Sequence, residues 1–320
     1  MKRVLLTDYA WPDLSIERSL IEGAGMTLVA GPSTPASAEE IAALARQHDP
    51  HAIMTNWAKV NADAIAACSD LAVVARLGVG LDNIDCEAAD RAGAIVTNVP
   101  DYCVEEVSDH AIALMLDWAR GVSALDREVK DGLWNPAGAR LRRVRNLTVG
   151  IVGFGRIGRR TAQKLAGFGC RVLANNRSGT IEPGAGAVFA SVEALVSVSD
   201  VVMLQVPLTP QTRHLVSAGL LKQFKPGALL VNVSRGVVVD SDALRAALDS
   251  GQLGAAALDV VEGEPQPPSW MLTHPRVVLT PHVAFSSDAS LEELRQRAAE
   301  EVVGVLNGQP PRHLCPFIQA

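Results

Sequence analysis

The feature that most constrains this chain is the segment TVGIVGFGRIG at residues 148–158. An apolar run typical of a buried strand leads directly into Gly153-x-Gly155-x-x-Gly158, and a helix-like segment follows from residue 157 to about residue 168. A strand, a glycine turn and a helix in this order are typical of a dinucleotide-binding βαβ unit. We therefore predict a cofactor site here, in preference to a purely structural glycine turn.

Each glycine of this motif has its own expected role. Gly153 permits the tight turn, Gly155 lets the backbone approach a pyrophosphate, and Gly158 lets the helix pack close to the strand. The N–H groups and the dipole at the start of the helix would then attract the phosphates.

The end of the next strand, residues 170–175, bears on the choice of cofactor. An NAD site places an acid there to bind the ribose 2′-hydroxyl. This chain instead has Asn175, Asn176, Arg177 and Ser178. Arg177 could pair with a 2′-phosphate, and no carboxylate would repel it. The sequence therefore predicts a preference for NADP(H). The alternative, with Arg177 a solvated loop residue, is a permissive site that also accepts NAD(H).

Length and composition indicate a two-domain α/β protein. The chain has 320 residues, which is typical of two domains. Hydrophobic residues make up 48% and aromatic residues only 4%, which suits buried parallel strands. The formal net charge of −6 gives no indication of a nucleic-acid partner.

The apolar runs, the N-terminus and the cysteines indicate in which cellular compartment the protein is expected. There is no apolar run long enough to span a membrane, and the N-terminus leads directly into a strand pattern, so we expect neither a membrane span nor a signal peptide. The five cysteines lack CxxC pairing, which predicts reduced and mostly buried thiols in the cytoplasm. No metal-ligand spacing occurs, so no metal site is predicted.

An α/β rhythm precedes the glycine motif. It predicts a first open parallel sheet, followed by one long helix over residues 104–130. The expected strands are residues 4–7, 27–30, 52–55, 73–76 and 95–98, and the expected helices are residues 14–22, 38–47, 62–68 and 86–92.

A second sheet is predicted to begin at Thr148. The last helix, residues 290–307, is expected to start with a capping box from Ser290 to Glu293 and to stop at Gly308. Further strands are expected at residues 171–175, 187–189, 201–205, 228–233, 255–260 and 277–280, with helices at residues 192–198, 218–223 and 242–251.

Chemically reactive side chains follow three of these strands. Arg235 stands beside a glycine after one strand, three acids (Asp259, Glu262 and Glu264) follow the next, and His282 follows the last. Ligands of open α/β sheets lie outside the carboxyl ends of the strands. Taken alone, each of these residues is explained as a structural residue or as a solvent-exposed surface residue. Together with a nicotinamide site they form a hydride-transfer constellation, in which His supplies the proton, a carboxylate orients it and Arg holds an anionic substrate.

The motifs GFGRIG, VNVSRG, DVVEGEP and TPH, in this order, resemble the D-isomer specific 2-hydroxyacid dehydrogenase family. The segment PDYCVEEVSDHA resembles the branch around C-terminal-binding proteins and phosphoglycerate dehydrogenases. The resemblance covers nearly the whole chain. It implies an NAD(P)-dependent oxidoreductase that transfers a hydride between a nicotinamide and C2 of a 2-oxo or 2-hydroxy acid.

The resemblance also implies roles for individual residues. By position, Arg235 matches the substrate arginine, Glu264 the catalytic acid and His282 the proton donor. Val79 and Gly80 match the loop whose N–H groups bind the substrate carboxylate. Besides the motif glycines, Asn176 and Arg177, the implied cofactor contacts are Arg156, Ile157, Pro207, Thr212, Val233, Asp259 and His282.

The resemblance further implies two Rossmann-like domains with parallel sheets and a cleft between them that closes by a hinge. Residues 1–99 plus 288–320 would form the flavodoxin-like substrate domain, and residues 100–287 the dinucleotide-binding Rossmann domain. A homodimer through the long helix and the arm around Trp134 is implied as well.

The expected reaction is reduction of a small 2-oxo acid of the glyoxylate or hydroxypyruvate type. One alternative is a dinucleotide-sensing, corepressor-like interaction protein. Another is 3-phosphoglycerate dehydrogenase, which needs a basic phosphate pocket, for which Lys59 and Arg76 are the nearest candidates. Substrate specificity stays open for two reasons. His282 is followed by Val-Ala-Phe285, where many members of the family it resembles have small residues or glycines and the corepressor branch tends to have a Trp, and Trp57 either walls the pocket or belongs to the core.

Overall fold

The computed structural model describes residues 1–314, and contacts divide the chain into two compact units. Unit 1 comprises Met1–Tyr102 together with Ser287–Ala320, and unit 2 comprises Cys103–Ser286. The sequence placed these boundaries at 99/100 and 287/288. The two crossings of the chain immediately precede helices α5 and α12, which begin at Val104 and Asp288.

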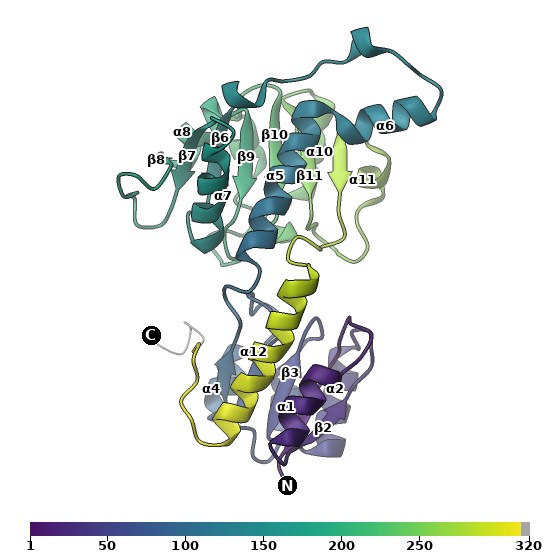
Figure 1. The fold of residues 1–320 in the computed structure, drawn as a ribbon, viewed down its shortest axis with the longest axis vertical. Helices are drawn as coiled ribbons and strands as arrows, with labels where there is room; N and C mark the ends of the chain where they lie inside the picture. The colour runs from purple at the N-terminus through teal and green to yellow at the C-terminus, as the bar shows by residue number, and fades with distance from the viewer. Residues whose placement is uncertain (315–320) are drawn as a thin grey trace. The chain divides into compact units, whose positions relative to one another are not determined.

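Unit 1 is built on a five-stranded parallel sheet of order β2-β1-β3-β4-β5. Leu5, Ile53 and Val74 of its central strands pack against the apolar faces of α2 to α4, while α1 and α12 lie side by side (Figure 1). The strands are β1 (Arg3–Leu6), β2 (Thr27–Ala30), β3 (Ala52–Thr55), β4 (Val73–Arg76) and β5 (Ile95–Thr97). The helices are α1 (Ser15–Gly23), α2 (Ala38–His48), α3 (Ala62–Ala66), α4 (Cys86–Arg91) and α12 (Asp288–Leu306).

The start of α12 differs from the prediction. Ser287, not Ser290, is the N-cap, because its extended backbone (φ −145°, ψ 168°) starts the helix earlier. Ser290 then lies at the third helical position, and the two serines exchange hydrogen bonds between their hydroxyls and N–H groups at 2.8 and 3.0 Å. Glu293 pairs instead with Arg297 one turn on, at 2.6 Å. The predicted capping box is therefore wrong, whereas the helix does end just before Gly308.

Unit 2 is built on a seven-stranded parallel sheet of order β12-β11-β10-β9-β6-β7-β8. Helices cover both faces (Figure 1): Met115 of α5 and Ile151 of β6 lie in one core cluster, and Leu248 of α10 lies in the other. The strands are β6 (Thr148–Val152), β7 (Arg171–Asn175), β8 (Val188–Phe189), β9 (Val201–Leu204), β10 (Ala228–Asn232), β11 (Leu253–Leu258) and β12 (Val277–Leu279). The helices are α5 (Val104–Arg120), α6 (Val122–Lys130), α7 (Arg156–Ala166), α8 (Val192–Val198), α9 (Ala218–Leu221), α10 (Ser241–Asp249) and α11 (Ser269–Thr273).

The predicted α/β class with two parallel sheets is confirmed by these topologies. The single long helix over residues 104–130 is wrong, because it is broken at Gly121 into α5 and α6. Gly121 has φ 62°, a left-handed conformation that ends a helix and that glycine adopts without strain. Helix α5 buries one face in the core, whereas α6 has no buried residue.

The cysteines differ from the prediction in their burial. The four described cysteines form no disulfide among residues 1–314, but only Cys103 is buried, whereas Cys68, Cys86 and Cys170 are partly exposed because they lie at the ends of helices and strands. Cys315 lies outside the described residues. Within residues 1–314 there is no group of three or more side chains arranged to hold a metal, and no helix long and apolar enough to cross a membrane.

Candidate active site

The glycine motif forms a turn whose backbone is open at the start of α7. Gly153 has φ 103°, and a Cβ there would lie 2.2 Å from the carbonyl oxygen of Gln205. A Cβ on Gly158 would lie 2.2 Å from the carbonyl oxygen of Gly153, so helix and turn touch through main chain alone. By contrast, a Cβ on Gly155 would meet no atom within 4 Å. The turn therefore leaves space beside Gly155 for a ligand.

Helix α7 presents its first turn to this open space. Gly155 is its N-cap and no side chain caps it. The N–H groups at the start of a helix have no partner within the helix, so those of Arg156, Ile157 and Gly158 can bind phosphate oxygens. These residues could hold the pyrophosphate of a dinucleotide.

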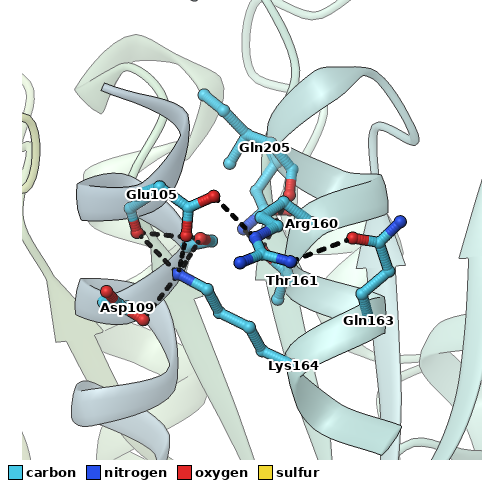
Figure 2. A network of polar contacts seen from close by, with 9 residues as sticks. Glu105, Asp109, Arg160, Thr161, Gln163, Lys164 and Gln205 are labelled. Atoms are coloured by element: carbon cyan, nitrogen blue, oxygen red, sulfur yellow. Dashed lines mark hydrogen bonds and ion pairs between the residues drawn. The ribbon is translucent and has the colours of Figure 1, made fainter. Parts of the chain in front are cut away.

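A network of charged side chains fastens α7 to α5 (Figure 2). The Glu105 carboxylate lies 2.7 Å from Arg160 Nε and 2.9 Å from Lys164 Nζ, and Lys164 also reaches Asp109 at 2.6 Å. The hydrogen bonds from Arg160, and then those from Lys164, hold the pKa of the Glu105 carboxyl below its usual range. The network lies between α5 and α7, the helix whose first turn faces the ligand space (Figure 2).

The loop after β7 carries the two residues expected to recognise the cofactor's ribose. Asn176 Nδ2 donates to the carbonyl oxygen of Thr180 at 2.7 Å, which closes the loop. Asn176 Oδ1 is enclosed, and among residues 1–314 it has no hydrogen-bond partner. Arg177 is exposed and, within the same residues, makes no ion pair or side-chain hydrogen bond. An unpaired acceptor and an unpaired cation thus stand where the next strand ends.

The other expected cofactor residues lie after neighbouring strands. Thr212 Oγ1 donates to the carbonyl oxygen of Pro207 at 2.7 Å and accepts from Thr209 N at 2.8 Å, which braces the loop that follows β9. Val233 directly follows β10 and is half-buried. Since parallel strands bring their carboxyl ends to one edge, these residues share an edge with the glycine turn.

His282 and Glu264 form a close pair. His282 Nδ1 lies 3.0 Å from Glu264 Oε2, and the two side chains are 19% and 35% exposed. In the tautomer that this pairing favours, Nδ1–H donates to the carboxylate and Nε2 is the nitrogen that exchanges a proton. The Phe285 ring packs edge-on against the imidazole, with 6.2 Å between the ring centres.

The three acids after β11 turn out to have different partners. Asp259 is 2% exposed, and its carboxylate accepts from Thr280 Oγ1 at 2.6 Å, Val283 N at 2.9 Å and Ala284 N at 3.0 Å. It thereby holds the turn that carries His282. Its predicted contact with the nicotinamide stays a prediction.

The second acid, Glu262, has a histidine of its own. Glu262 Oε1 lies 3.4 Å from His214 Nε2, on the loop after β9. Only the third acid, Glu264, reaches His282.

A further histidine, His110, was not identified from the sequence as part of this site. Its Nε2 lies 2.9 Å from Thr280 Oγ1 and 3.6 Å from Asp259 Oδ1, so α5 contacts the same hydrogen-bonded group. His110 lies in the segment PDYCVEEVSDHA, which was the available signal. No spacing rule links it to Thr280, because the contact depends on how α5 packs on the sheet.

Arg235 follows β10, the strand beside β11. Its guanidinium donates to the carbonyl oxygen of Ser234 at 2.8 Å, and Asn232 Nδ2 donates to the carbonyl oxygen of Arg235 at 3.0 Å. A Cβ on Gly236 would lie 2.0 Å from the carbonyl carbon of Val261. Glycine at this position therefore lets the arginine turn lie directly against the start of the acidic loop. Arg235, Glu264 and His282 follow β10, β11 and β12, three adjacent strands.

In unit 1, the loop 77–80 has the features of an anion site. Its carbonyl groups are occupied: Arg76 donates to those of Leu77 and Gly80, the latter at 3.1 Å, and Asn98 Nδ2 donates to that of Val79 at 2.7 Å. The N–H groups of Val79 and Gly80 have no hydrogen-bond partner among the described residues. Two free donors on a fixed loop can bind one carboxylate.

Comparison with known proteins agrees with this geometry. Residues 112–284 match the family model described as D-isomer specific 2-hydroxyacid dehydrogenase, NAD binding domain. The chain is 37% identical over 278 residues to glyoxylate reductase of Thermococcus onnurineus (strain NA1), which covers 84% of this chain and 83% of that protein.

Two further matches complete the comparison. D-3-phosphoglycerate dehydrogenase of Archaeoglobus fulgidus is 36% identical over 264 residues, covering 82% of this chain but 50% of that protein. The NADPH-dependent glyoxylate/hydroxypyruvate reductase of Sinorhizobium meliloti, solved with NADP and malonate, superposes with a TM-score of 0.85 at 30% identity, over 99% of this chain and 97% of that one. The chain therefore belongs to the D-isomer specific 2-hydroxyacid dehydrogenase family and is an NAD(P)-dependent 2-oxo acid reductase.

Proposed function

We propose that this enzyme reduces a small 2-oxo acid of the glyoxylate or hydroxypyruvate type, with NADPH as its preferred coenzyme. The observation that carries the proposal is the pair formed by His282 and Glu264, on the same sheet edge as Arg235 and the open glycine turn. Unit 2 would act as the dinucleotide-binding domain and unit 1 as the substrate domain.

Each residue has a defined role in this proposal. The bound nicotinamide supplies or accepts the hydride at C2. Arg235 holds the C2 oxygen and the carboxylate through its planar fork. The N–H groups of Val79 and Gly80 have the role that the family resemblance implies for their loop, recognition of a substrate carboxylate. His282 Nε2 delivers the proton to the C2 oxygen, and Glu264 stabilises the imidazolium before that transfer.

The NADPH preference rests on the loop after β7. Asn176 is neutral where an acid would repel the 2′-phosphate, and Arg177 is an exposed cation without a partner among residues 1–314. The relative from Sinorhizobium meliloti, described as NADPH-dependent, agrees with this choice. NAD(H) stays the alternative coenzyme.

The contacts of Arg76 disfavour 3-phosphoglycerate as substrate. That substrate would need a cation for its phosphate. Of the two candidates, Arg76 is only 8% exposed, with its guanidinium donating to main-chain carbonyls of loop 77–80, which leaves only the exposed Lys59. The corepressor-like alternative is disfavoured because Arg235, Glu264 and His282 are all present and the last two are paired. A pure binding protein has no need of that pair.

We also propose a homodimer in the cytoplasm, with no nucleic-acid or membrane partner. Helix α6 and the arm after it carry exposed apolar side chains: Val122 (61%), Val129 (47%), Leu133 (51%) and Trp134 (82%). Burying such a surface against a second copy would be favourable. The free thiols suit a reducing compartment, and the net charge of −6 does not favour nucleic acid.

The test is NADPH oxidation, followed by absorbance, with a panel of glyoxylate, hydroxypyruvate, pyruvate and 3-phosphohydroxypyruvate. We expect glyoxylate and hydroxypyruvate to give the highest kcat/KM. Higher kcat/KM with 3-phosphohydroxypyruvate would favour the phosphoglycerate alternative, and coenzyme binding without turnover of any acid would favour the corepressor alternative. Sedimentation equilibrium checks the dimer, and Trp134→Ser should weaken it.

A further inference from the structure

Asp8, which has no part in the proposed chemistry, is a fully buried carboxylate in unit 1, with 0% exposure. Its oxygens accept hydrogen bonds from three consecutive N–H groups: Asn56 at 3.2 Å, Trp57 at 2.7 Å and Ala58 at 3.1 Å. Thr7 Oγ1 donates to it as well, at 2.7 Å. Burying a carboxylate is costly unless hydrogen-bond donors surround it. Because a different conformation of loop 56–58 would leave the Asp8 charge buried without these donors, the bonds favour the one conformation that is observed.

The position of Asp8 in the sheet is where ligands bind in folds of this kind. The strand order β2-β1-β3-β4-β5 reverses direction between β1 and β3. In open parallel sheets the ligand crevice lies outside the carboxyl ends of the strands at this reversal. Asp8 follows β1 and residues 56–58 follow β3, so the carboxylate joins the two sides of the reversal.

The loop 56–58 is fastened from its carbonyl side too. Asn83 Nδ2 donates to the carbonyl oxygens of Asn56 at 3.3 Å and Ala58 at 2.9 Å, and Thr55 Oγ1 donates to that of Ala58 at 2.7 Å. Since Asp8 accepts from all three N–H groups, the loop cannot use them to bind a substrate. The group that remains available on this loop, at the point between β1 and β3 where the strand order reverses, is the half-buried side chain of Trp57.

Trp57 also lies beside Arg76, the residue that precedes the proposed carboxylate-binding loop. The Arg76 guanidinium carbon lies 5.8 Å from the centre of the Trp57 ring, and the same guanidinium donates to the carbonyl oxygens of Leu77 and Gly80. The indole is therefore held on one side by the main chain that Asp8 fixes. On another side it meets the arginine that shapes loop 77–80.

We propose that Asp8 is a positioning residue that fixes Trp57 as a wall limiting the size of the side chain attached to C2 of the substrate. This inference rests on the proposed reduction of small 2-oxo acids. Loop 77–80 would recognise the carboxylate common to all such acids. The Asp8-held loop would then distinguish short side chains from long ones.

Asp8→Asn is the most selective variant, because it changes only the contact with Trp57 N and keeps the shape of the side chain. The acceptor of Asn56 and Ala58 is Oδ1, which an asparagine can retain, whereas Oδ2 accepts from Trp57 N and would become an amide NH₂ facing that donor. We expect the ratio of kcat/KM for glyoxylate over 4-methyl-2-oxopentanoate to fall at least about fivefold. KM for glyoxylate should rise, while kcat and the Kd for NADPH change less than about twofold.

Asp49→Asn provides the matched control. Asp49 is also a carboxylate that accepts from main chain, taking the Ser69 N–H at 2.8 Å, but it lies at the opposite, amino edge of the same sheet, just before β3. Its left-handed backbone (φ 42°) tolerates asparagine well. We expect it to lower the melting temperature without changing the substrate ratio. An equal change in both variants would mean a general stability effect and would overturn the inference.

Two further measurements keep the inference testable. Hydrogen exchange of the amides at residues 56–58, measured without substrate, should be faster in Asp8→Asn than in wild type. If Asp8→Asn does not fold, Trp57→Leu takes its place and should lower the same ratio. An unchanged ratio in a folded Asp8→Asn, or in Trp57→Leu, overturns this inference alone. A wild type that turns over none of the 2-oxo acids overturns the proposed function, and this inference with it.

Discussion

His282 Nδ1 lies 3.0 Å from Glu264 Oε2, although the two residues are contributed by loops after different strands. The turn of His282 is itself held by hydrogen bonds to the Asp259 carboxylate from Val283 N and Ala284 N, at 2.9 and 3.0 Å. Two acids thus orient the imidazole: Glu264 contacts the His282 side chain, and Asp259 holds the backbone of the turn.

Replacement of His282 by alanine should remove the proton donor and leave the cofactor contacts of the glycine turn in place. We expect kcat to fall by about 10²–10⁴-fold, the range for loss of a general acid. Fluorescence titration should give a Kd for NADPH close to that of wild type. An unchanged kcat in this variant would assign the proton transfer to another group.

Coenzyme preference should depend on the loop after β7. One charge-assisted contact with phosphate contributes about 1.5–3 kcal/mol, so we expect NADPH to be favoured over NADH by roughly ten- to a hundred-fold in kcat/KM. Arg177→Ala should lower the affinity for NADPH and leave the affinity for NADH nearly unchanged. Asn176→Asp should shift the coenzyme preference toward NADH. Equal kcat/KM values for the two coenzymes in wild type would contradict this assignment.

Gly236→Ala should damage the site through the backbone alone. Its Cβ would lie 2.0 Å from the carbonyl carbon of Val261, so the arginine turn and the acidic loop would have to separate. We expect a loss of about 1–3 kcal/mol in the free energy of unfolding and a marked fall in kcat, measured by denaturant titration and by turnover. Gly23→Ala is the control, because a Cβ there meets no atom within 4 Å.

The stability of unit 2 should depend on acid pH through Glu105. Hydrogen bonds from Arg160 and then from Lys164 lower the pKa of its carboxyl from an ordinary value of 4.5. A lowered carboxyl pKa stabilises the folded state above the unfolded-state pKa, and this contribution is lost as pH falls through the folded-state pKa. Glu105→Gln should therefore bring the melting temperature down slightly at pH 6, and the difference from wild type should diminish as the pH falls below 4.5 and through the lowered folded-state pKa.

A melting-temperature difference that persisted or grew at low pH would show that Glu105 acts through packing and not through its charge. High salt should also reduce the difference at pH 6, because the pair is largely exposed to solvent.

The fold class was predictable because its signals are local. The glycine turn, the apolar runs and the glycine at position 308 each act within a few residues, and the predicted strands 27–30, 52–55 and 73–76 match β2, β3 and β4. Element ends were less predictable: the expected strand 255–260 is displaced to Leu253–Leu258, because apolar Val260 is buried just beyond the strand end.

The parts of the site that escaped prediction depend on contacts distant in sequence. His110 meets Thr280 across 170 positions, and Asp8 meets Trp57 across 49. The break at Gly121 was missed for a different reason, since a glycine within a helical pattern is compatible with either a continuous helix or a C-cap. The strand ends predicted that one of three acids orients His282, but no local signal distinguishes Glu264 from the other two, and its assignment depended on the family resemblance.

The backbone of His282 has φ 55°, a left-handed conformation that is unfavourable for a side chain with a Cβ. Asp259 maintains that conformation through hydrogen bonds to the next two residues. Turnover and heat resistance are therefore opposed at this one position: glycine there would relieve the strain and abolish the chemistry. Selection for thermal stability alone would therefore favour glycine at position 282, whereas selection for turnover retains the histidine.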